Sequence, residues 1–418
     1  MHHFERPGAQ VDHVAVPYRS SLRAGPDLVV ARAEALAGYG FEVDVRHETE
    51  FRGALNGLDG LVTLAESRFI IRPVSSGIEP MQTSYIDCSN EVSPIRQPQG
   101  DRLCWLAPDI SEDDFLLSLT NAARDEIDAL ARHFNENPLP ILYRQLDDFE
   151  LPACRETMAA MKRILDDGVG FAVLDRLPMD DYPIDTLLEI YWVLGQCIGR
   201  PVAQKWNGQM IYDVSDTGAD YAYGTRGSHT SVELVFHTDN AFARMVPDYV
   251  GLLCRSPAKS GGVSRFCSLY SVHQRMLEQY PGQLERLYQP MLFDRQKEHR
   301  EGAEPVCLAP YFSWRNQRMF ARANSSLVRK GYQVAGETMD AALADALDAI
   351  DEVCAAQDLW FEAPLQRGQI QYLNNHEVGH YRSAFVDYDE PERKRHLYRL
   401  WHRAAGSNSY DGRYPDEH

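Results

Sequence analysis

The sequence predicts an α+β protein with a mainly β core, a sandwich or barrel with flanking helices and an extra N-terminal α/β segment. Between about residues 200 and 335, short apolar runs are separated by Gly, Pro and Asp turns, as is typical of successive strands. In the segments on either side, apolar residues recur at helical spacing. Two further apolar runs, at 369–373 and 396–402, are expected to be the last strands of the core.

The composition is that of an ordinary soluble protein, with 44% hydrophobic and 25% charged residues among 418. The 61 acidic and 42 basic residues give a net charge of −19, which repels phosphate backbones and anionic membranes. We therefore expect a small-molecule substrate and neither nucleic acid nor a membrane as partner. A homo-oligomer is left open.

The eight cysteines form no CxxC pair, and most have apolar neighbours. This pattern favours buried thiols in a reducing compartment over a disulfide framework or a zinc site. The N-terminal residues lack the apolar run of a signal peptide, and no apolar stretch is long enough to cross a membrane. We expect a cytoplasmic protein.

Residues 1–138 are predicted to form an N-terminal α/β appendage of unknown role. The sequence NENPLP then interrupts the chain, and we place a domain boundary there, so that residues 139–418 form the second domain. The elements expected in the appendage are strands at 14–16 and 41–45, a helix at 27–36, an irregular stretch at 76–110 and a helix at 111–136 with Ser111 as its N-cap.

The second domain is expected to begin with a helix, a strand and a helix, at 152–167, 170–174 and 184–195. The clearest helix of the chain is predicted at 337–356. Its apolar residues fall on one face and its acidic residues on the other, as in a helix that packs on a core.

The motif His237-Thr238-Asp239 is the first candidate for a metal site. In an extended segment, residues i and i+2 point to the same side, so an imidazole and a carboxylate can reach one ion. Two histidines and one carboxylate on one face of an octahedron leave three positions open, which suits non-haem Fe(II) and oxygen chemistry. The motif alone is weak, because about one such match is expected by chance among the 14 histidines.

A second pair of candidate ligands lies in LNNHEVGHYRSAF, residues 373–385. His376 and His380 have the spacing of a metal-binding pair on one helix face, but Gly379 and the apolar run just upstream argue against a long helix. The spacing therefore leaves open whether either histidine binds a metal.

Two further features favour an anion site. A Gly-Gly turn, which permits close backbone approach, is followed by Ser264 with its hydroxyl donor. In the strand expected near residue 396, Arg395 and Arg399 face the same side, and arginines that face a barrel interior are costly unless they meet anions. A dicarboxylate cosubstrate would supply such an anion. The alternative is a solvated edge strand.

The motifs HTD, GG-x-S, NN-xxx-H-x-R-x-AF and R-xxx-R-L-W occur in this order over about residues 165–405. This order resembles the TauD/TfdA (taurine dioxygenase-like, clavaminate synthase-like) family of 2-oxoglutarate-dependent oxygenases. The resemblance implies a double-stranded β-helix (jelly roll) core with Fe(II) as cofactor, 2-oxoglutarate as cosubstrate and O2. It also implies a dioxygenase that oxidises, chiefly hydroxylates, an unactivated C–H of an amino acid, amine or natural-product intermediate, releasing succinate and CO2.

The same resemblance assigns roles to individual residues. His237, Asp239 and His380 would be the iron ligands. Arg395 would pair with the distal carboxylate of 2-oxoglutarate, assisted by Ser264. Because related halogenases replace the acid with a small residue, the carboxylate of Asp239 favours hydroxylation or another halide-free oxidation.

Arg399 would lie near the cosubstrate or a substrate anion, and the division of roles between it and Arg395 is left open. The candidates for substrate contact are Glu233, Asn240, His376 and Arg226. A carboxylate at Glu233, four residues before the metal motif, suggests a substrate with an amine or guanidine group.

Two other hypotheses share these residues. A non-catalytic jelly-roll protein would bind a metal or ligand without turnover. A zinc hydrolase would need a general base and would give Arg395 no role. The sequence does not determine the substrate, the site of oxidation, or whether the outcome is hydroxylation, desaturation or cyclisation.

Overall fold

The computed structural model describes residues 103–405 except 206, 219–226, 300–301 and 316–317, and the backbone of four strands before them. The chain divides into two compact units, Met1–Gln82 and Thr83–His418. In the smaller unit, β1 (Phe41–Arg46), β2 (Gly60–Leu64) and β3 (Ser67–Pro73) form an antiparallel sheet in the order β1-β3-β2. β1 confirms the strand predicted at 41–45. The strand predicted at 14–16 and the helix at 27–36 lie outside the described residues.

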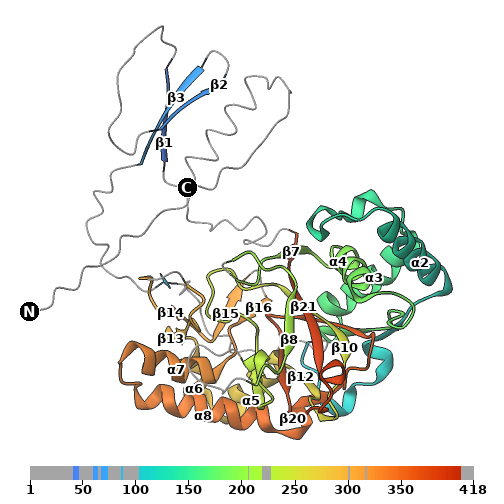
Figure 1. Ribbon diagram of the computed structural model, residues 1–418. Helices are drawn as coiled ribbons and strands as arrows, with labels where there is room; N and C mark the ends of the chain where they lie inside the picture. Colours follow the sequence, from blue (N-terminus) through green and yellow to red (C-terminus); the bar gives the residue numbers. More distant parts are fainter. Residues whose placement is uncertain are drawn as a thin grey trace, which may run out of the picture. The chain divides into compact units, whose positions relative to one another are not determined.

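Two β-sheets form the centre of the larger unit (Figure 1). The major sheet has the order β5-β6-β18-β10-β21-β7, and β8 also pairs with β21. Its strands are β5 (Leu116–Ser118), β6 (Phe171–Asp175), β7 (Arg200–Val202), β8 (Tyr212–Ser215), β10 (Tyr249–Ser256), β18 (Ile370–Asn374) and β21 (His396–Arg403). The minor sheet has the order β17-β12-β19-β9, with strands β9 (Leu234–His237), β12 (Ser264–Ser268), β17 (Trp360–Glu362) and β19 (Val378–Arg382).

Apolar side chains from both sheets meet between them. Phe171 of β6 stacks on Phe266 of β12, with ring centroids 4.3 Å apart. Successive residues of a strand point to opposite faces, so alternate residues of the major sheet join this inner cluster while their neighbours face outward. The other inward residues of the major sheet are Val173, Val250, Leu373 and Trp401. The β-rich core predicted from the sequence is therefore present as two facing sheets.

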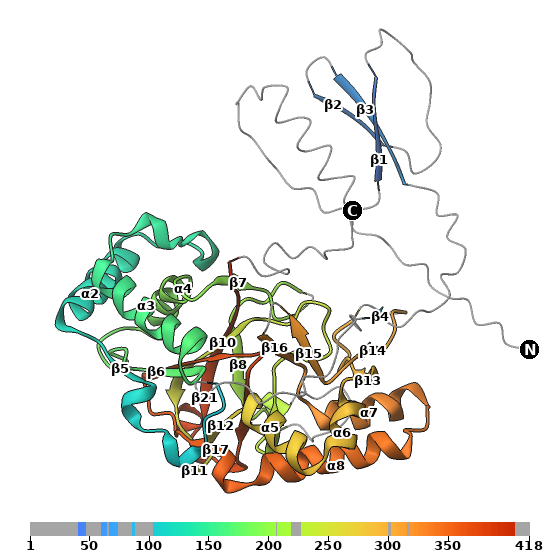
Figure 2. The same ribbon diagram turned by 180° about the vertical axis from the view of Figure 1, so that it is seen from behind.

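Three helices cover the outer face of the major sheet, α2 (Asn121–Glu136), α3 (Pro152–Asp167) and α4 (Ile184–Gly195) (Figure 2). Tyr398 and Leu400 of β21 are buried with them. These two residues alternate with Leu397 and Arg399, as predicted for this strand. α3, β6 and α4 confirm the elements predicted at 152–167, 170–174 and 184–195.

The helix predicted at 111–136 begins only at Asn121, so the prediction was wrong for residues 111–120. A short 3-10 turn at Glu112–Asp114 follows Ser111, and Leu116–Ser118 then pairs parallel with β6. Pairing with β6 satisfies the backbone of this apolar run, so it does not need helical hydrogen bonds. The N-cap of α2 is Thr120, whose Oγ1 accepts a hydrogen bond from the N–H of Ala123 at 3.1 Å.

The packing of α2 bears on the predicted domain boundary. α2 contacts α3 and α4 and shares their buried cluster. The elements just before residue 138 thus belong to the larger unit, which begins at Thr83. The NENPLP sequence ends α2 without separating two compact units, because its apolar face is buried against α3 and α4.

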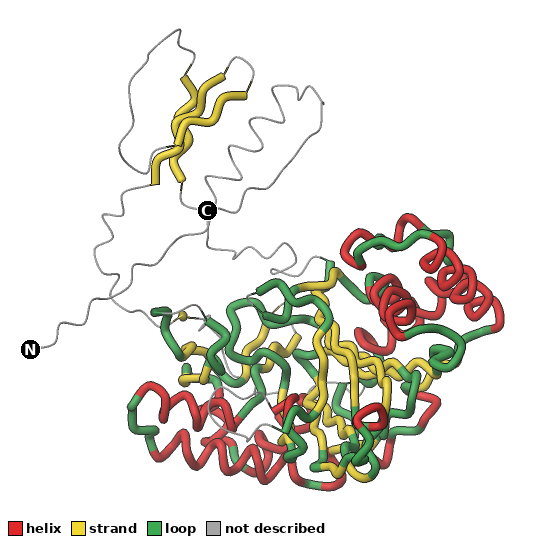
Figure 3. Tube along the Cα trace, viewed as in Figure 1, coloured by secondary structure: helices red, strands yellow, loops and turns green. Residues whose placement is uncertain are grey.

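A second group of helices packs together beside the sheets (Figure 3). It consists of α5 (Leu269–Gln279), α6 (Pro281–Leu287), α7 (Ser325–Ala335) and α8 (Ala341–Ala355). α8 confirms the helix predicted at 337–356, but the other three interrupt the region predicted to be β-rich. Ser268 and Asn324 cap α5 and α7 through their side chains, a signal that was present in the sequence.

The remaining short strands form small ladders around this helical group and the sheet edges. β13 (Met291–Asp294), β14 (Val306–Ala309) and β4 (Ile86–Asp87) form one sheet, and β15 (Phe312–Arg315) pairs with β16 (Arg318–Ala321). β11 (Ser260–Gly261) pairs with β20 (Phe385–Val386).

In the described part of the chain, no helix combines the length and apolarity needed to cross a membrane. None of the seven described cysteines forms a disulfide, and five of them are buried. This agrees with the thiol pattern read from the sequence. Cys88 lies outside the described residues.

Candidate active site

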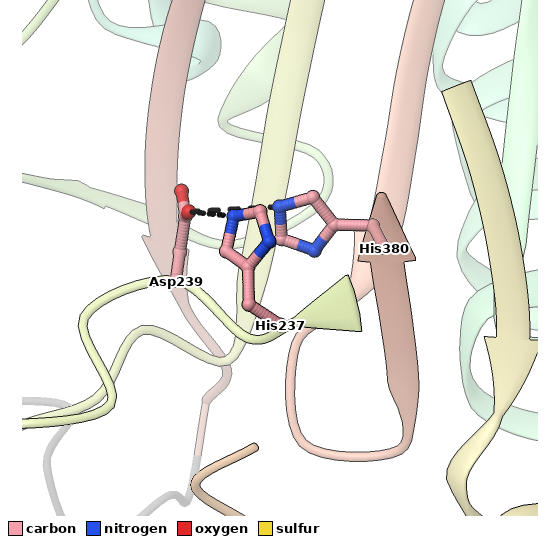
Figure 4. A group of neighbouring side chains, drawn as sticks. All are labelled: His237, Asp239 and His380. Carbon is pink, nitrogen blue, oxygen red and sulfur yellow. Dashed lines mark ion pairs between the residues drawn. The ribbon is translucent and has the colours of Figure 1, made fainter. Parts of the chain in front are cut away.

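His237, Asp239 and His380 form one cluster (Figure 4). One potential ligand atom from each lies within 4.8 Å of the other two. The Nε2 atoms of His237 and His380 are 3.7 and 3.6 Å from Oδ1 of Asp239. Two imidazoles and a carboxylate that converge in this way are the donor set of a non-haem Fe(II) site, so the residues present fit the metal that the sequence implies.

Strand pairing brings the two histidines together. His237 is the last residue of β9 and pairs with His380 of β19 in the minor sheet. Asp239 follows in a turn that Asn375 holds from the other side. The Oδ1 of Asn375 accepts the N–H of Asp239 at 2.7 Å, and its Nδ2 donates to the carbonyl of Asp239 at 3.0 Å. The carboxylate is therefore fixed through its own backbone.

The second oxygen of Asp239 has its own partners. The indole Nε1 of Trp401 donates to Oδ2 at 2.8 Å, and Nη1 of Arg399 lies 2.9 Å from the same atom. Burial alone would raise the pKa of Asp239, but the charge of Arg399 and the interaction with His380 hold it well below its usual range. Asp239 is thus ionised, with Oδ1 directed at the imidazoles.

His237 is poised as a neutral ligand. Its Nδ1 lies 2.7 Å from the carbonyl oxygen of Val235, which accepts the Nδ1 proton and leaves Nε2 with its lone pair facing Asp239. Burial and the neighbouring His380 lower the pKa of His237 to about 3, against the opposing effect of Asp239. The imidazole is therefore uncharged at neutral pH, as a metal ligand must be.

The structure separates the two arginines that the sequence left undivided. Arg399 reaches the metal cluster and also donates from Nε to Oε1 of Gln204 at 2.8 Å. Arg395 is 5% exposed and lies elsewhere, with its guanidinium 5.2 Å from the ring centroid of Phe385. Its Nη1 is buried without a hydrogen-bond partner among the described residues. A buried cation with an unsatisfied donor fits the carboxylate of a cosubstrate.

The Gly-Gly turn contributes to the same region. Gly262 has a φ of +66°, and a Cβ there would lie 3.0 Å from Nε of Arg395. Only a glycine lets the backbone approach the guanidinium this closely. Ser264, two residues on, is 8% exposed and begins β12. Its role as a partner of Arg395 stays a prediction.

A cavity of about 230 Å³ opens beside the metal cluster. Its wall includes Glu233 and Asn240, two of the predicted substrate contacts, together with Arg399. The carboxylate of Glu233 accepts a hydrogen bond from the hydroxyl of Tyr381, next to His380 in β19. The other lining residues are Gly227, Ser228, Leu234, Val235, His237, Thr238, Asp239, Phe242, Gln296, Asn324, Ser326, Leu327 and Trp401.

His376 is not among the residues that line this cavity, and its predicted contact with substrate stays a prediction. It is 8% exposed, its Nε2 lies 2.8 Å from Oδ1 of Asp248, and its ring stacks on Phe320 at 4.0 Å. It lies in the turn before β19, so its side chain points into the protein instead of following the face of His380. Arg226 lies outside the described residues.

The sequence reasoning assigned no role to three residues near the site: Trp401, Tyr381 and Arg382. For Trp401 a signal existed. In a strand, Trp401 falls on the same face as Arg399, two residues earlier, and its indole can only donate. The contact of Tyr381 with Glu233 depends on how β9 and β19 pair, which no local pattern reveals.

The two facing sheets and the His-Asp-His cluster at the end of the minor sheet define a β-core oxygenase with a facial metal site. Residues 130–401 match the taurine catabolism dioxygenase TauD, TfdA family. The chain belongs to this family. It is an Fe(II)- and 2-oxoglutarate-dependent oxygenase with the double-stranded β-helix fold predicted above.

Curated relatives and solved structures agree with this placement. FR-33289 synthase of Streptomyces rubellomurinus (strain ATCC 31215) is 24% identical over 322 residues, 74% of this chain and 91% of that protein. Taurine hydroxylase-like protein SAT17 of Stachybotrys chartarum (strain CBS 109288 / IBT 7711) is 24% identical over 315 residues, 72% of this chain and 78% of that protein.

Two solved structures share the fold. An asparagine oxygenase in complex with Fe(II), 2S,3S-3-hydroxyasparagine and succinate has a TM-score of 0.52 and 19% identity, and covers 69% of this chain and 93% of its own. The non-heme iron oxygenase OrfP in complex with Fe and α-ketoglutaric acid has a TM-score of 0.53 and 15% identity, and covers 71% and 97%.

Proposed function

We propose that this oxygenase hydroxylates an unactivated C–H bond of a small polar substrate, with 2-oxoglutarate as cosubstrate and succinate and CO2 as products. The observation that carries the proposal is the convergence of His237, Asp239 and His380 beside a cavity whose wall includes Glu233. These three residues would hold Fe(II). When bound, Fe(II) supplies the chemistry that couples decarboxylation of 2-oxoglutarate to oxidation of the substrate.

The protein's own residues prepare this site before any ligand arrives. Val235 fixes the proton of His237 on Nδ1, and Trp401 and Arg399 hold Oδ2 of Asp239 so that Oδ1 stays available. Ligands oriented by a second layer of hydrogen bonds lose less entropy when the metal binds. The acid at position 239 also completes the ligand set, which supports hydroxylation over halogenation.

Arg395 and Ser264 would receive the distal carboxylate of 2-oxoglutarate, since Arg395 is buried with an unsatisfied N–H. Arg399 would stand beside the metal end of the cosubstrate. Its salt bridge with Asp239 keeps both groups charged in a buried place.

Glu233 would select the substrate. Glu233 is one of the residues that line the cavity, and its carboxylate accepts a hydrogen bond from the hydroxyl of Tyr381. An amine or guanidinium is the matching group. Asn240, on the same wall, would add a polar contact. Two of the similar structures hold hydroxylated amino acids, 3-hydroxyasparagine and (3S)-hydroxy-L-Arg, so amino acids are the first class to test.

The test has two stages. Anaerobic protein with Fe(II) should develop a charge-transfer absorption when 2-oxoglutarate is added, and His237→Ala and Asp239→Ala should lose it. A screen of amino acids and amines should then identify compounds that stimulate succinate formation. His133→Ala, at an exposed position on α2, is the control that should behave as wild type.

Each failure has a distinct meaning. Metal binding without the charge-transfer absorption would support a non-catalytic metal-binding protein and overturn the proposal. Activity that survives Arg395→Ala and needs no 2-oxoglutarate would point to a hydrolase. Stimulation only by substrates without a cationic group would remove the role proposed for Glu233.

We further propose a cytoplasmic location and partners limited to small molecules. The negative net charge and the absence of disulfides among the described cysteines support this. Size-exclusion chromatography with light scattering would decide whether the enzyme works as a homo-oligomer.

A further inference from the structure

A second buried arginine lies close to Arg395. Arg382 is in β19, two residues after His380, and is 6% exposed. The guanidinium carbons of Arg382 and Arg395 lie 4.9 and 5.2 Å from the same ring centroid, that of Phe385. The two cations therefore share one apolar neighbour and little solvent.

This arrangement is costly as it stands. Nε and Nη1 of Arg382 and Nη1 of Arg395 are buried and have no hydrogen-bond partner in the described part of the chain. Both guanidinium groups carry positive charge at neutral pH. Two buried like charges with spare donors are stable only if an anion offsets them.

Asp216 attracts Arg382 electrostatically and Asp387 lies near Arg395, but neither carboxylate uses these donors. Asp387 accepts the backbone N–H of Arg395 through Oδ1 at 2.7 Å, and its Oδ2 is itself unpaired among the described residues. Ser264, the residue predicted to assist Arg395, pairs with Arg382 across the β12–β19 ladder. Arg382 thus lies at the same place as the predicted carboxylate site.

The third guanidinium nitrogen of Arg382, Nη2, binds backbone carbonyls. Nη2 donates to the carbonyl oxygen of Thr230 at 2.7 Å and also to that of Val232. These carbonyls belong to residues 227–235, the approach segment, which leads into β9 and ends two residues before His237. Glu233 and other residues of the approach segment line the substrate cavity. One guanidinium therefore touches both the carboxylate region and the cavity wall.

We propose that Arg382 is a positioning residue that joins Arg395 in receiving the distal carboxylate of 2-oxoglutarate and thereby fixes the approach segment that carries Glu233. The inference rests on the proposed function, because it takes 2-oxoglutarate as the anion. Cosubstrate binding would immobilise Arg382, and Arg382 would hold the carbonyls of Thr230 and Val232 in place. The substrate wall would then be complete only after 2-oxoglutarate is bound.

The first test compares two ligands that differ in the distal carboxylate. Anaerobic protein loaded with Fe(II) is titrated with 2-oxoglutarate or with pyruvate, which keeps the 2-oxo acid and lacks the distal carboxylate. Arg382→Met should lower the affinity for 2-oxoglutarate about 10- to 100-fold, the loss typical of a charge-assisted hydrogen bond. The affinity for pyruvate should stay nearly unchanged. Arg382→Lys, which keeps the charge but cannot make all three contacts, should fall between. Arg393→Met, at a half-exposed position, is the matched control.

The second test measures the coupling and needs no variant. In wild-type protein, 2-oxoglutarate should slow amide hydrogen exchange in residues 227–235, and pyruvate at the same metal occupancy should not. Equal protection of residues 227–235 by both ligands would overturn the proposal. So would an equal loss of affinity for both ligands in Arg382→Met. If 2-oxoglutarate does not bind even to wild type, the proposed function fails as well, so the two failures are distinguishable.

Discussion

Trp401 and Asp239 are joined by a buried hydrogen bond of 2.8 Å from the indole Nε1 to Oδ2. This bond turns the other carboxylate oxygen toward His237 and His380. An indole cannot accept a proton and carries no charge, so it orients the carboxylate without competing with the metal. Trp401, on β21 of the major sheet, thereby orients Asp239, whose two histidine partners lie on β9 and β19 of the minor sheet.

Replacing Trp401 with Phe should weaken metal binding about 10- to 100-fold, the usual cost of losing a group that orients a metal ligand. The ring would still fill the core, so the fold should persist. Isothermal titration with Co(II) in place of Fe(II) gives the affinity. Trp360→Phe is the control, because the Nε1 of Trp360 donates to a carbonyl outside the site. An unchanged Co(II) affinity in Trp401→Phe would show that Arg399 alone orients Asp239.

Asn375→Ala should destabilise the protein by about 3 kcal/mol, because three buried hydrogen bonds are lost and their partners are left unsatisfied. These bonds run to the N–H and carbonyl of Asp239 and to the carbonyl of Pro247. Urea unfolding followed by circular dichroism measures the difference. Asn137→Ala removes an exposed side-chain bond at the end of α2 and should cost under about 1 kcal/mol. Equal costs for the two variants would contradict the argument.

Gly262→Ala should lower the affinity for 2-oxoglutarate several-fold, because the added Cβ would press on Arg395 from 3.0 Å. Alanine at a positive φ also costs about 1 kcal/mol or more in stability. Gly208→Ala separates the two effects, since Gly208 has a φ of +84° but open space at its Cβ position. It should lose stability alone. If both variants bind 2-oxoglutarate as wild type does, Arg395 is not the cosubstrate's partner.

Stability should fall between about pH 6.5 and pH 4, in part because of His273. Its side chain is 2% exposed with Nε2 2.9 Å from the hydroxyl of Tyr288, and burial lowers its pKa to about 4. The unfolded chain binds a proton at this residue near pH 6.5 and the folded chain does not, so acid favours unfolding. The stability that His273 contributes is present above pH 6.5 and is lost as the pH approaches 4.

His273→Gln tests this directly. The change in unfolding free energy between pH 7 and pH 5 should be about 2 kcal/mol smaller in the variant than in wild type. Gln274→Ala, at the next position, introduces no change in titrating groups and should follow the wild-type curve. A His273→Gln curve parallel to wild type would mean that other groups account for the acid sensitivity.

Local patterns located much of the fold. The helices at 152–167 and 184–195 have strong apolar periodicity, and α3 and α4 match them to the residue. The alternation in β21 was also readable. Three helices in the region from 200 to 335 were not predicted because short strands surround them, although Ser268 and Asn324 are N-cap residues of α5 and α7. Leu116–Ser118 became a strand only because β6 offers it a partner.

The sequence by itself determined the family, through four motifs in a fixed order, and with it the metal, the cosubstrate and the likeness of His237, Asp239 and His380 to an iron-binding triad. It could not separate Arg395 from Arg399, and the contact of His376 with substrate stays a prediction. Tertiary structure decided which of these side chains meet, because strand register sets their neighbours. His380 faces His237 across the minor sheet, His376 turns to Asp248, and Arg399 pairs with Asp239. These contacts join residues far apart in the chain, and no local periodicity encodes them.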